Sequence, residues 1–252
     1  MRVFACSDIH VDFEYNLRWV NSLSYSDFKN DILILGGDVT DDILLFQKVL
    51  EDLRKRFLHL LYIPGNHDLW VRNDTAMNSF DKLRQIKICA NNAGVRMEPL
   101  HLAILSIVPL WGWYDYSFGQ PSLETLDTWM DYRLCRWPKR YDAERITHYF
   151  VDMNESYLEI ENEFMISFSH FVPRIDLLPV YIPPSKRKLY PVLGSSLLEK
   201  QIRKLQSNIH VYGHSHLNRQ VFKDNTLYIN NAFGYPYETH ITAKELKCIY
   251  ET

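Results

Sequence analysis

The sequence is short of the features that mark membrane proteins, disulfide-rich proteins and proteins that coat nucleic acid. No apolar stretch is long enough to span a bilayer. The four cysteines are scattered without Cys-x-x-Cys spacing, so neither a zinc knuckle nor a disulfide framework is expected. Charge is nearly balanced, with 28 Lys and Arg against 31 Asp and Glu. This balance argues against a nucleic-acid coat protein, although a local basic groove is compatible with it.

These absences set expectations about location and size. An apolar run predicts a strand from residue 2, which leaves no room for a signal peptide before it. We therefore expect a cytoplasmic protein with reduced thiols and no membrane partner. The chain has 252 residues and 46% hydrophobic content, enough for a single domain over 1–252 with a large core.

Glycine is also scarce, with nine in the whole chain, and four of the nine stand in short motifs rich in Asp, Asn or His. These four are Gly36, Gly37, Gly65 and Gly213. Glycine allows a tight turn or a close approach of the backbone to another group. We infer that the backbone comes close to a cluster of polar side chains at these positions.

Five motifs carry the polar residues, in chain order: Asp8-x-His10, Gly36-Gly37-Asp38, Gly65-Asn66-His67-Asp68, Ser169-His170 and Gly213-His214-Ser215-His216. The first three close apolar runs that are typical of strands, at 2–6, 31–35 and 58–63. Residues two apart in an extended chain point the same way, so each Asp-x-His or His-x-His pair can chelate one ion. The donors suffice for two divalent metals that share a carboxylate.

Each motif alone has a simpler interpretation. Asp-x-His recurs by chance, and Gly-Gly-Asp after a strand is often a turn or a helix cap. A lone histidine such as His170 is more often a core or surface residue, and His148 competes with it for a ligand role. His148, however, lies in a predicted helix, whereas His170 follows the strand-like run 164–168. The remaining His59, His101, His210 and His240 are interpreted as structural or surface residues.

In this order the motifs are those of the calcineurin-like metallophosphoesterases, which the sequence resembles from its first residues to about residue 235. The resemblance implies an α/β fold: a four-layer αββα sandwich of two mixed sheets flanked by helices, with the metals at one end. It also implies two metal sites joined by Asp38. One would use Asp8, His10, Asp38 and His216, and the other Asp38, Asn66, His170 and His214.

The resemblance further implies a two-metal reaction in which a bridging hydroxide attacks phosphorus. His67 follows a ligand directly and is the expected proton donor to the leaving group. Asp41 stands where related phosphatases place a carboxylate that orients this histidine, although it also suits a helix N-terminus. The ligand set accepts Mn, Fe, Zn, Ni or Co, and manganese is the metal we expect first.

Along the rest of the chain, helices are predicted at about 14–22, 41–57, 75–87, 142–163 and 195–206. Further strands are predicted within 88–107 and at 164–169 and 208–212. The segments 219–222, 227–230 and 246–250 alternate like antiparallel strands. The pattern is consistent with a βαβ start followed by a mixed sheet.

The segment 109–141 departs from a minimal core and holds four of the six tryptophans: Trp111, Trp113, Trp129 and Trp137. Interleaved with Arg and Lys, these rings predict a cap beside the metals that stacks on an aromatic or nucleotide-like group. The alternative is that they pack the insertion onto the core. A proline-rich segment at 173–191 carries Lys186, Arg187 and Lys188 and is interpreted as a solvated loop.

The substrate is left open among several classes. The positions after Asp38 and before Asn66 lack the Arg residues of the protein Ser/Thr phosphatases, so that branch is disfavoured. We expect hydrolysis of a phosphodiester or phosphomonoester on a small or nucleotide-like molecule, as in the small phosphodiesterase-like members. A nuclease is the alternative enzyme, and nucleic acid is a less favoured partner. A non-catalytic scaffold is the alternative of another class, and the oligomeric state stays open.

Overall fold

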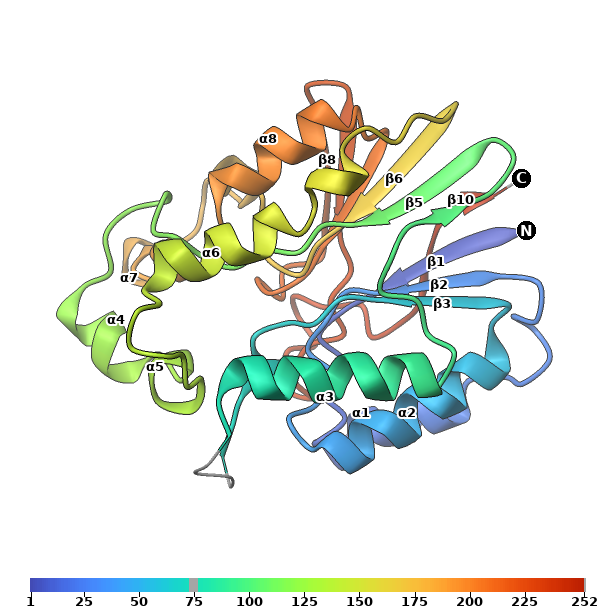
Figure 1. Ribbon diagram of the computed structural model, residues 1–252, viewed down its shortest axis with the longest axis horizontal. Helices are drawn as coiled ribbons and strands as arrows, with labels where there is room; N and C mark the ends of the chain where they lie inside the picture. Colours follow the sequence, from blue (N-terminus) through green and yellow to red (C-terminus); the bar gives the residue numbers. More distant parts are fainter. Residues whose placement is uncertain (73–76, 252) are drawn as a thin grey trace.

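The computed structural model describes residues 1–72 and 77–251 and contains two sheets (Figure 1). The first sheet has the order β10-β1-β2-β3 and the second the order β4-β5-β6-β7-β9-β8. The strands of the first are β1 (Arg2–Cys6), β2 (Ile32–Leu35), β3 (His59–Tyr62) and β10 (Lys247–Glu251). Those of the second are β4 (Leu100–His101), β5 (Leu105–Pro109), β6 (Phe164–Phe168), β7 (Ile209–Tyr212), β8 (Arg219–Lys223) and β9 (Thr226–Asn230).

Both sheets are mixed. The neighbours β1, β2 and β3 are parallel, as are β5, β6, β7 and β9, and the edge strands β10, β4 and β8 pair antiparallel. The inner strands read as continuous apolar runs, as parallel strands covered on both faces do. Every residue of β2 and β7 is buried. The two sheets meet where Ser7 donates a backbone hydrogen bond to Asn231 over 3.1 Å and accepts one from Phe233 over 2.8 Å.

Helices cover the outer face of each sheet, so the layers run helix, sheet, sheet, helix (Figure 1). The first sheet is covered by α1 (Glu14–Ser22), α2 (Ile43–Arg56) and α3 (Ser79–Asn92). The second is covered by α6 (Ala143–Asp152) and α8 (Ser196–Lys204). This architecture is the four-layer αββα sandwich that the resemblance implies. Among the described residues, no helix combines the length and apolar character that a membrane span requires.

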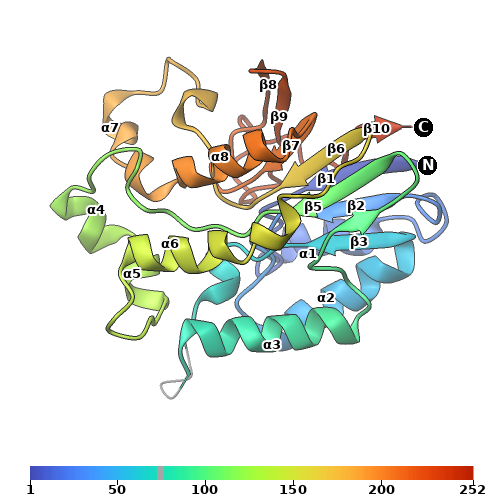
Figure 2. The same cartoon turned by 45° about the horizontal axis from the view of Figure 1, so that its top comes forward.

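Short helical segments connect these layers. They are η1 (His67–Leu69), α4 (Leu123–Thr128), α5 (Asp131–Leu134), η2 (Glu155–Tyr157), η3 (Ile175–Leu177), α7 (Pro184–Arg187) and η4 (Tyr190–Val192). Both views place α4, α5 and α7 at the end of the molecule opposite to the two chain termini (Figure 1, Figure 2).

The strands and helices up to β3 lie where the sequence predicts them, but two later predictions are wrong. The helix expected at about 75–87 begins at Ser79, because Asn78 and Asp81 form a capping box there, and it continues to Asn92. It therefore occupies the start of the predicted strand region 88–107, and positions 75 and 76 lie outside the described residues. The helix expected to reach 163 ends at Asp152.

The three C-terminal strands form both antiparallel and parallel pairs, and they do not all join the same sheet. The segments 219–222 and 227–230 form the antiparallel hairpin β8 and β9, but β9 also pairs parallel with β7. The last predicted strand, β10, crosses to the first sheet and pairs antiparallel with β1. Local alternation predicts a strand but carries no information about which sheet it joins.

The aromatic residues of 109–141 mostly pack inward. Trp113 is 1% exposed, and its ring lies 4.9 Å from that of Phe171 and 5.3 Å from that of Trp137. Trp111 is also buried. The expectation that Trp113 stacks on a substrate is therefore wrong, because a ring enclosed by other rings cannot reach a ligand. The packing interpretation describes this residue.

Candidate metal centre

The polar motifs follow the carboxyl ends of parallel strands, which meet at one edge of each sheet. Asp8 follows β1, Asp38 follows β2 and Asn66 follows β3. From the second sheet, His170 follows β6 and His214 follows β7. Backbone bonds join neighbouring loops, because Asp8 donates to the carbonyl of Gly37 over 2.8 Å. The fold thus brings the five motifs, which follow strands of both sheets, together in one cluster.

The backbone is strained at five of the seven candidate ligands. Asp8, His10, Asp38, His214 and His216 have φ between 37° and 65°. Residues other than glycine rarely adopt this left-handed conformation, and it costs about 1 to 3 kcal/mol at each position unless the surroundings impose it. Such strain concentrated in one cluster is typical of a functional site.

Two glycines make room for the cluster. A Cβ atom on Gly65 would lie 2.1 Å from Oδ1 of Asp38, and one on Gly213 would lie 2.6 Å from Oδ2 of Asp8. Both contacts are closer than non-bonded atoms can approach. The scarce glycines therefore stand where a side chain would displace a candidate ligand.

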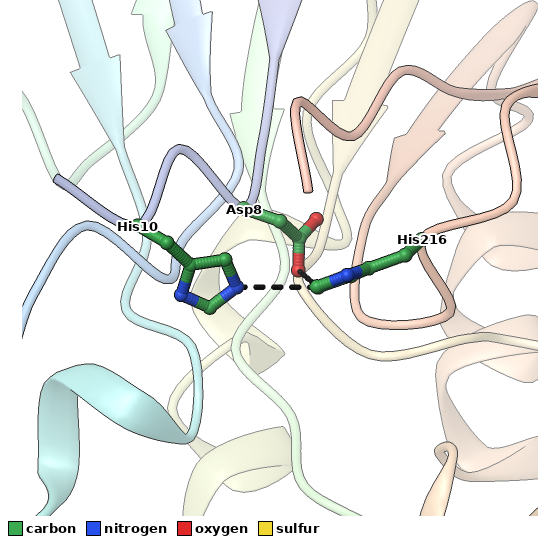
Figure 3. Close-up of side chains that lie close together, drawn as sticks. All are labelled: Asp8, His10 and His216. Atoms are coloured by element: carbon green, nitrogen blue, oxygen red, sulfur yellow. Dashed lines mark hydrogen bonds and ion pairs between the residues drawn. The ribbon is translucent and has the colours of Figure 1, made fainter. Parts of the chain in front are cut away.

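Asp8, His10 and His216 form the first group and point toward one another (Figure 3). Nε2 of His216 lies 3.2 Å from Oδ1 of Asp8 and 3.2 Å from Nε2 of His10. Oδ2 of Asp38 lies 3.9 Å from Nε2 of His10. All four residues are buried.

The second group contains His170, His214, Asn66 and again Asp38. Nε2 of His170 lies 3.0 Å from Nδ1 of His214 and 3.1 Å from Oδ1 of Asn66. The same nitrogen is 3.6 Å from Oδ2 of Asp38. One oxygen of Asp38 therefore faces both groups, as a bridging ligand must.

The hydrogen bonds of the outward-facing ring nitrogens show which nitrogen of His170 and of His214 carries the proton. Nδ1 of His170 donates to the carbonyl of Gly36 over 2.9 Å, and Nε2 of His214 donates to the carbonyl of Val192 over 3.0 Å. A carbonyl only accepts, so each ring carries its proton on the outer nitrogen. The two inner nitrogens then face each other with lone pairs, and Oδ1 of Asn66 adds a third. Such an arrangement of acceptors fits a bound cation.

Electrostatics agree with neutral imidazole ligands in this group. Burial, followed by the neighbouring His170, lowers the pKa of His214 to about 3. Burial also lowers the pKa of His170. His216 differs: burial lowers its pKa, but the carboxylates of Asp8 and Glu238 outweigh burial and raise it to about 9. In the absence of metal, His216 is thus the ring that shares a proton with carboxylates.

His67 lies beside both groups and, with His10 and Asp38, forms a third set of side chains that could hold a metal ion. Its side chain is 19% exposed, and its ring stacks on that of Trp70 with a centroid distance of 3.6 Å. Nε2 of His67 lies 3.8 Å from Oδ2 of Asp38 and 3.5 Å from the hydroxyl of Tyr235. Burial and then His10 lower the pKa of His67 well below its usual value. An anion bound beside the ring would favour its protonated form.

Asp41 does not take the position expected of it. Its carboxylate pairs with Arg72, and its backbone carbonyl accepts a hydrogen bond from Lys82. Among the described residues, no hydrogen bond joins it to His67. The ring of His67 stacks instead on Trp70, and the orienting role of Asp41 stays a prediction.

Three further residues contact the cluster and carry no motif that sequence reasoning could have recognised. Oε2 of Glu238 lies 2.7 Å from Nδ1 of His216. The ring of Tyr235 stacks on His10 with a centroid distance of 4.6 Å. Asp131 accepts a hydrogen bond from the amide of Asn66 over 2.8 Å. A fourth residue, Asp68, could have been recognised from the sequence, because it ends the Gly65–Asp68 motif. It accepts backbone hydrogen bonds from Asp38 and Gly65, each over 2.8 Å.

The chain belongs to the calcineurin-like phosphoesterases, whose family profile matches residues 1–218. It is accordingly a metal-dependent phosphoric ester hydrolase.

The chain is similar to the acyl-carrier-protein phosphodiesterase PptH of Mycobacterium tuberculosis, with 33% identity over 125 residues. That alignment covers 46% of this chain and 38% of PptH, so it spans well under two thirds of the relative. The crystal structure of the phosphopantetheinyl hydrolase PptH from the same organism matches the whole chain. Its TM-score is 0.85 at 23% identity, and the match covers 100% of this chain and 96% of that one. The structural likeness shows a shared fold.

We predict that the chain binds two divalent ions. Crystals grown with Mn²⁺ should show two anomalous peaks about 3.5 to 4 Å apart on either side of Asp38. Because the ions bind only the folded chain, Mn²⁺ should also raise the Tm. Asp38→Asn should lose most of that rise, whereas Asp127→Asn, an exposed carboxylate on α4, should keep it. A Tm rise of equal size in the Asp38 variant would contradict the assignment.

Proposed function

We propose that the protein is a dinuclear phosphodiesterase that cleaves a phosphopantetheinyl group from a carrier protein. The observation that carries the metal chemistry is the set of opposed acceptors at His170, His214 and Asn66, which fits a cation. The likeness to PptH supports the substrate. No sequence motif distinguishes this substrate from other phosphodiesters, so the proposal on substrate stands on that likeness.

The seven ligands divide into two sets that share Asp38. Asp8, His10, Asp38 and His216 would hold one ion; Asp38, Asn66, His170 and His214 would hold the other. Two divalent ions bound there would bind the phosphoryl oxygens and lower the pKa of water between them toward neutrality. Sites of mixed Asp, Asn and His ligands accept several first-row metals. Of these, manganese is the first to test.

His67 would protonate the leaving oxygen. It lies beside the bridging carboxylate and is more exposed than the ligands, so its ring can meet a substrate bound at the cluster. The backbone N–H of His67 donates to Oδ1 of Asp38 over 2.9 Å, and the stack on Trp70 limits rotation of the ring. An anionic phosphate would raise the pKa of His67 and supply the protonated form that an acid needs.

The rings beside the ligands suit a long, uncharged group better than a polyanion. Tyr235 lies against His10, Trp70 lies against His67, and Trp129 packs at an interplanar angle of 76° to His214, with 5.8 Å between centroids. Beyond its phosphate, a pantetheinyl chain carries no charge, so the partly exposed neutral rings of Tyr235 and Trp129 can line its path. A nucleic acid would instead require several phosphate contacts along a basic groove.

We predict that the metal-loaded enzyme releases phosphopantetheine from a phosphopantetheinylated acyl-carrier protein. The intact mass of the carrier should fall to that of its unmodified form, while Asp38→Asn enzyme leaves it unchanged. Bis(p-nitrophenyl) phosphate, cyclic nucleotides and single-stranded DNA serve as competing substrates. Faster cleavage of a nucleotide or of DNA, with the carrier left intact, would overturn the proposed substrate and retain the phosphodiesterase class.

The acid role of His67 predicts a defect that depends on the leaving group. His67→Ala should slow hydrolysis of an alkyl diester by roughly 10²- to 10⁴-fold, the usual contribution of general acid catalysis. Nitrophenolate leaves without a proton, so the loss on nitrophenyl esters should be much smaller. Bound metal should match the wild type, and His148→Ala, an exposed histidine on α6, is the control. Equal losses on both ester types would argue against an acid.

A further inference from the structure

A single carboxylate within the segment 109–141 joins the metal cluster to the insertion. Asp131, the first residue of α5, is 2% exposed. Its Oδ1 accepts from Nδ2 of Asn66 over 2.8 Å and from Nε1 of Trp70 over 2.7 Å. Its Oδ2 accepts from Nε1 of Trp129 over 2.8 Å. Three side-chain N–H groups and the hydroxyl of Tyr114 thus converge on one buried carboxylate, 65 residues along the chain from Asn66.

The bond to Asn66 determines which end of its amide faces the cluster. An amide has an accepting oxygen and a donating nitrogen, and only the oxygen can bind a cation. Because Asp131 only accepts, it selects the nitrogen and leaves Oδ1 directed at His170, 3.1 Å from Nε2. Without such a partner the amide could turn over and present its NH₂ group to the metal.

The hydrogen bond from Trp70 to Asp131 helps to position His67, the proposed acid. The indole of Trp70 is anchored at Nε1 by Asp131, and its ring carries the stacked imidazole of His67. Trp129, the third donor, forms a T-shaped pair with the ring of His214. The carboxylate of Asp131 therefore holds two groups in place: the amide of Asn66, which faces one ion site, and the indole of Trp70, on which His67 stacks.

We propose that Asp131 is a positioning residue: it fixes the amide of Asn66 with its oxygen toward the metal and anchors Trp70 beneath His67. This inference rests on the proposed role of Asn66 as a ligand. Segment 109–141 then completes the site that contains His170 and His214, rather than selecting the substrate through Trp113. Polar partners of metal ligands of this kind typically change metal affinity or activity by about 10- to 100-fold when mutated.

The test is Asp131→Leu, a variant of similar size that removes both accepting oxygens, titrated with Mn²⁺ by calorimetry in the absence of substrate. We expect two binding events in the wild type. In the variant the ion held by Asp8, His10 and His216 should keep its affinity, while the other should bind about 10- to 100-fold more weakly. Asp127→Asn, an exposed carboxylate on the neighbouring α4, should bind both ions like the wild type.

An exchange of the two side chains separates positioning from a general structural role. In the double variant Asn66→Asp, Asp131→Asn, the new amide can donate to the new carboxylate, whose other oxygen still faces the cluster, and its oxygen can still accept from Trp129. The N–H of Trp70 loses its acceptor, so the exchange tests the contact with residue 66 and not the anchoring of Trp70. We expect this variant to fold and to bind the weakened ion more tightly than Asp131→Leu alone. An exchange variant that is unfolded, or that shows no recovery, overturns the inference.

The outcomes also separate this inference from the proposed function. If the wild type binds no more than one ion, the dinuclear assignment fails. If it binds two and Asp131→Leu binds both equally well, only the positioning role of Asp131 fails.

Discussion

The rest of the structure depends on two imidazole nitrogens whose lone pairs face each other. Nε2 of His170 and Nδ1 of His214 lie 3.0 Å apart, and each ring has its proton committed to a backbone carbonyl on the far side. Acceptors at this distance repel unless a cation lies between them. Burial increases the repulsion because little water is present to reduce it. The fold must therefore hold these rings in place before any metal arrives.

Two sheets share that task. Each provides parallel strands whose carboxyl ends carry ligands, and their buried apolar strands form the rigid part of the molecule. The strain of left-handed backbone at Asp8, Asp38 and three histidines is sustained by that packing. Asp68 ties the loops after β2 and β3 together by accepting from Asp38 and Gly65. Stability contributed by the strands thus maintains a cluster that is unfavourable without its cations.

The sequence was informative wherever a residue's position follows from its neighbours in the chain. Strands such as β2 are apolar runs ended by glycine, so the Asp38 that follows is placed by local geometry. Asp131 and Glu238 reach the cluster through tertiary contacts, and neither stands in a recognisable motif or follows a strand. Composition shows the aromatic density around Trp113 but not which way its ring points. The start of α3 depends on the capping box of Asn78 and Asp81, which the hydrophobic pattern alone does not reveal.

The tautomers of His170 and His214 provide the most direct test of this account. In ¹⁵N-histidine NMR of the metal-free protein, we expect His170 to carry its proton on Nδ1 and His214 on Nε2. Added Zn²⁺ should shift the opposite, unprotonated nitrogen of each ring and leave the protonated ones bonded to their carbonyls. A proton on Nε2 of His170, hydrogen-bonded to His214, would contradict the account, because the inner nitrogens would then need no cation.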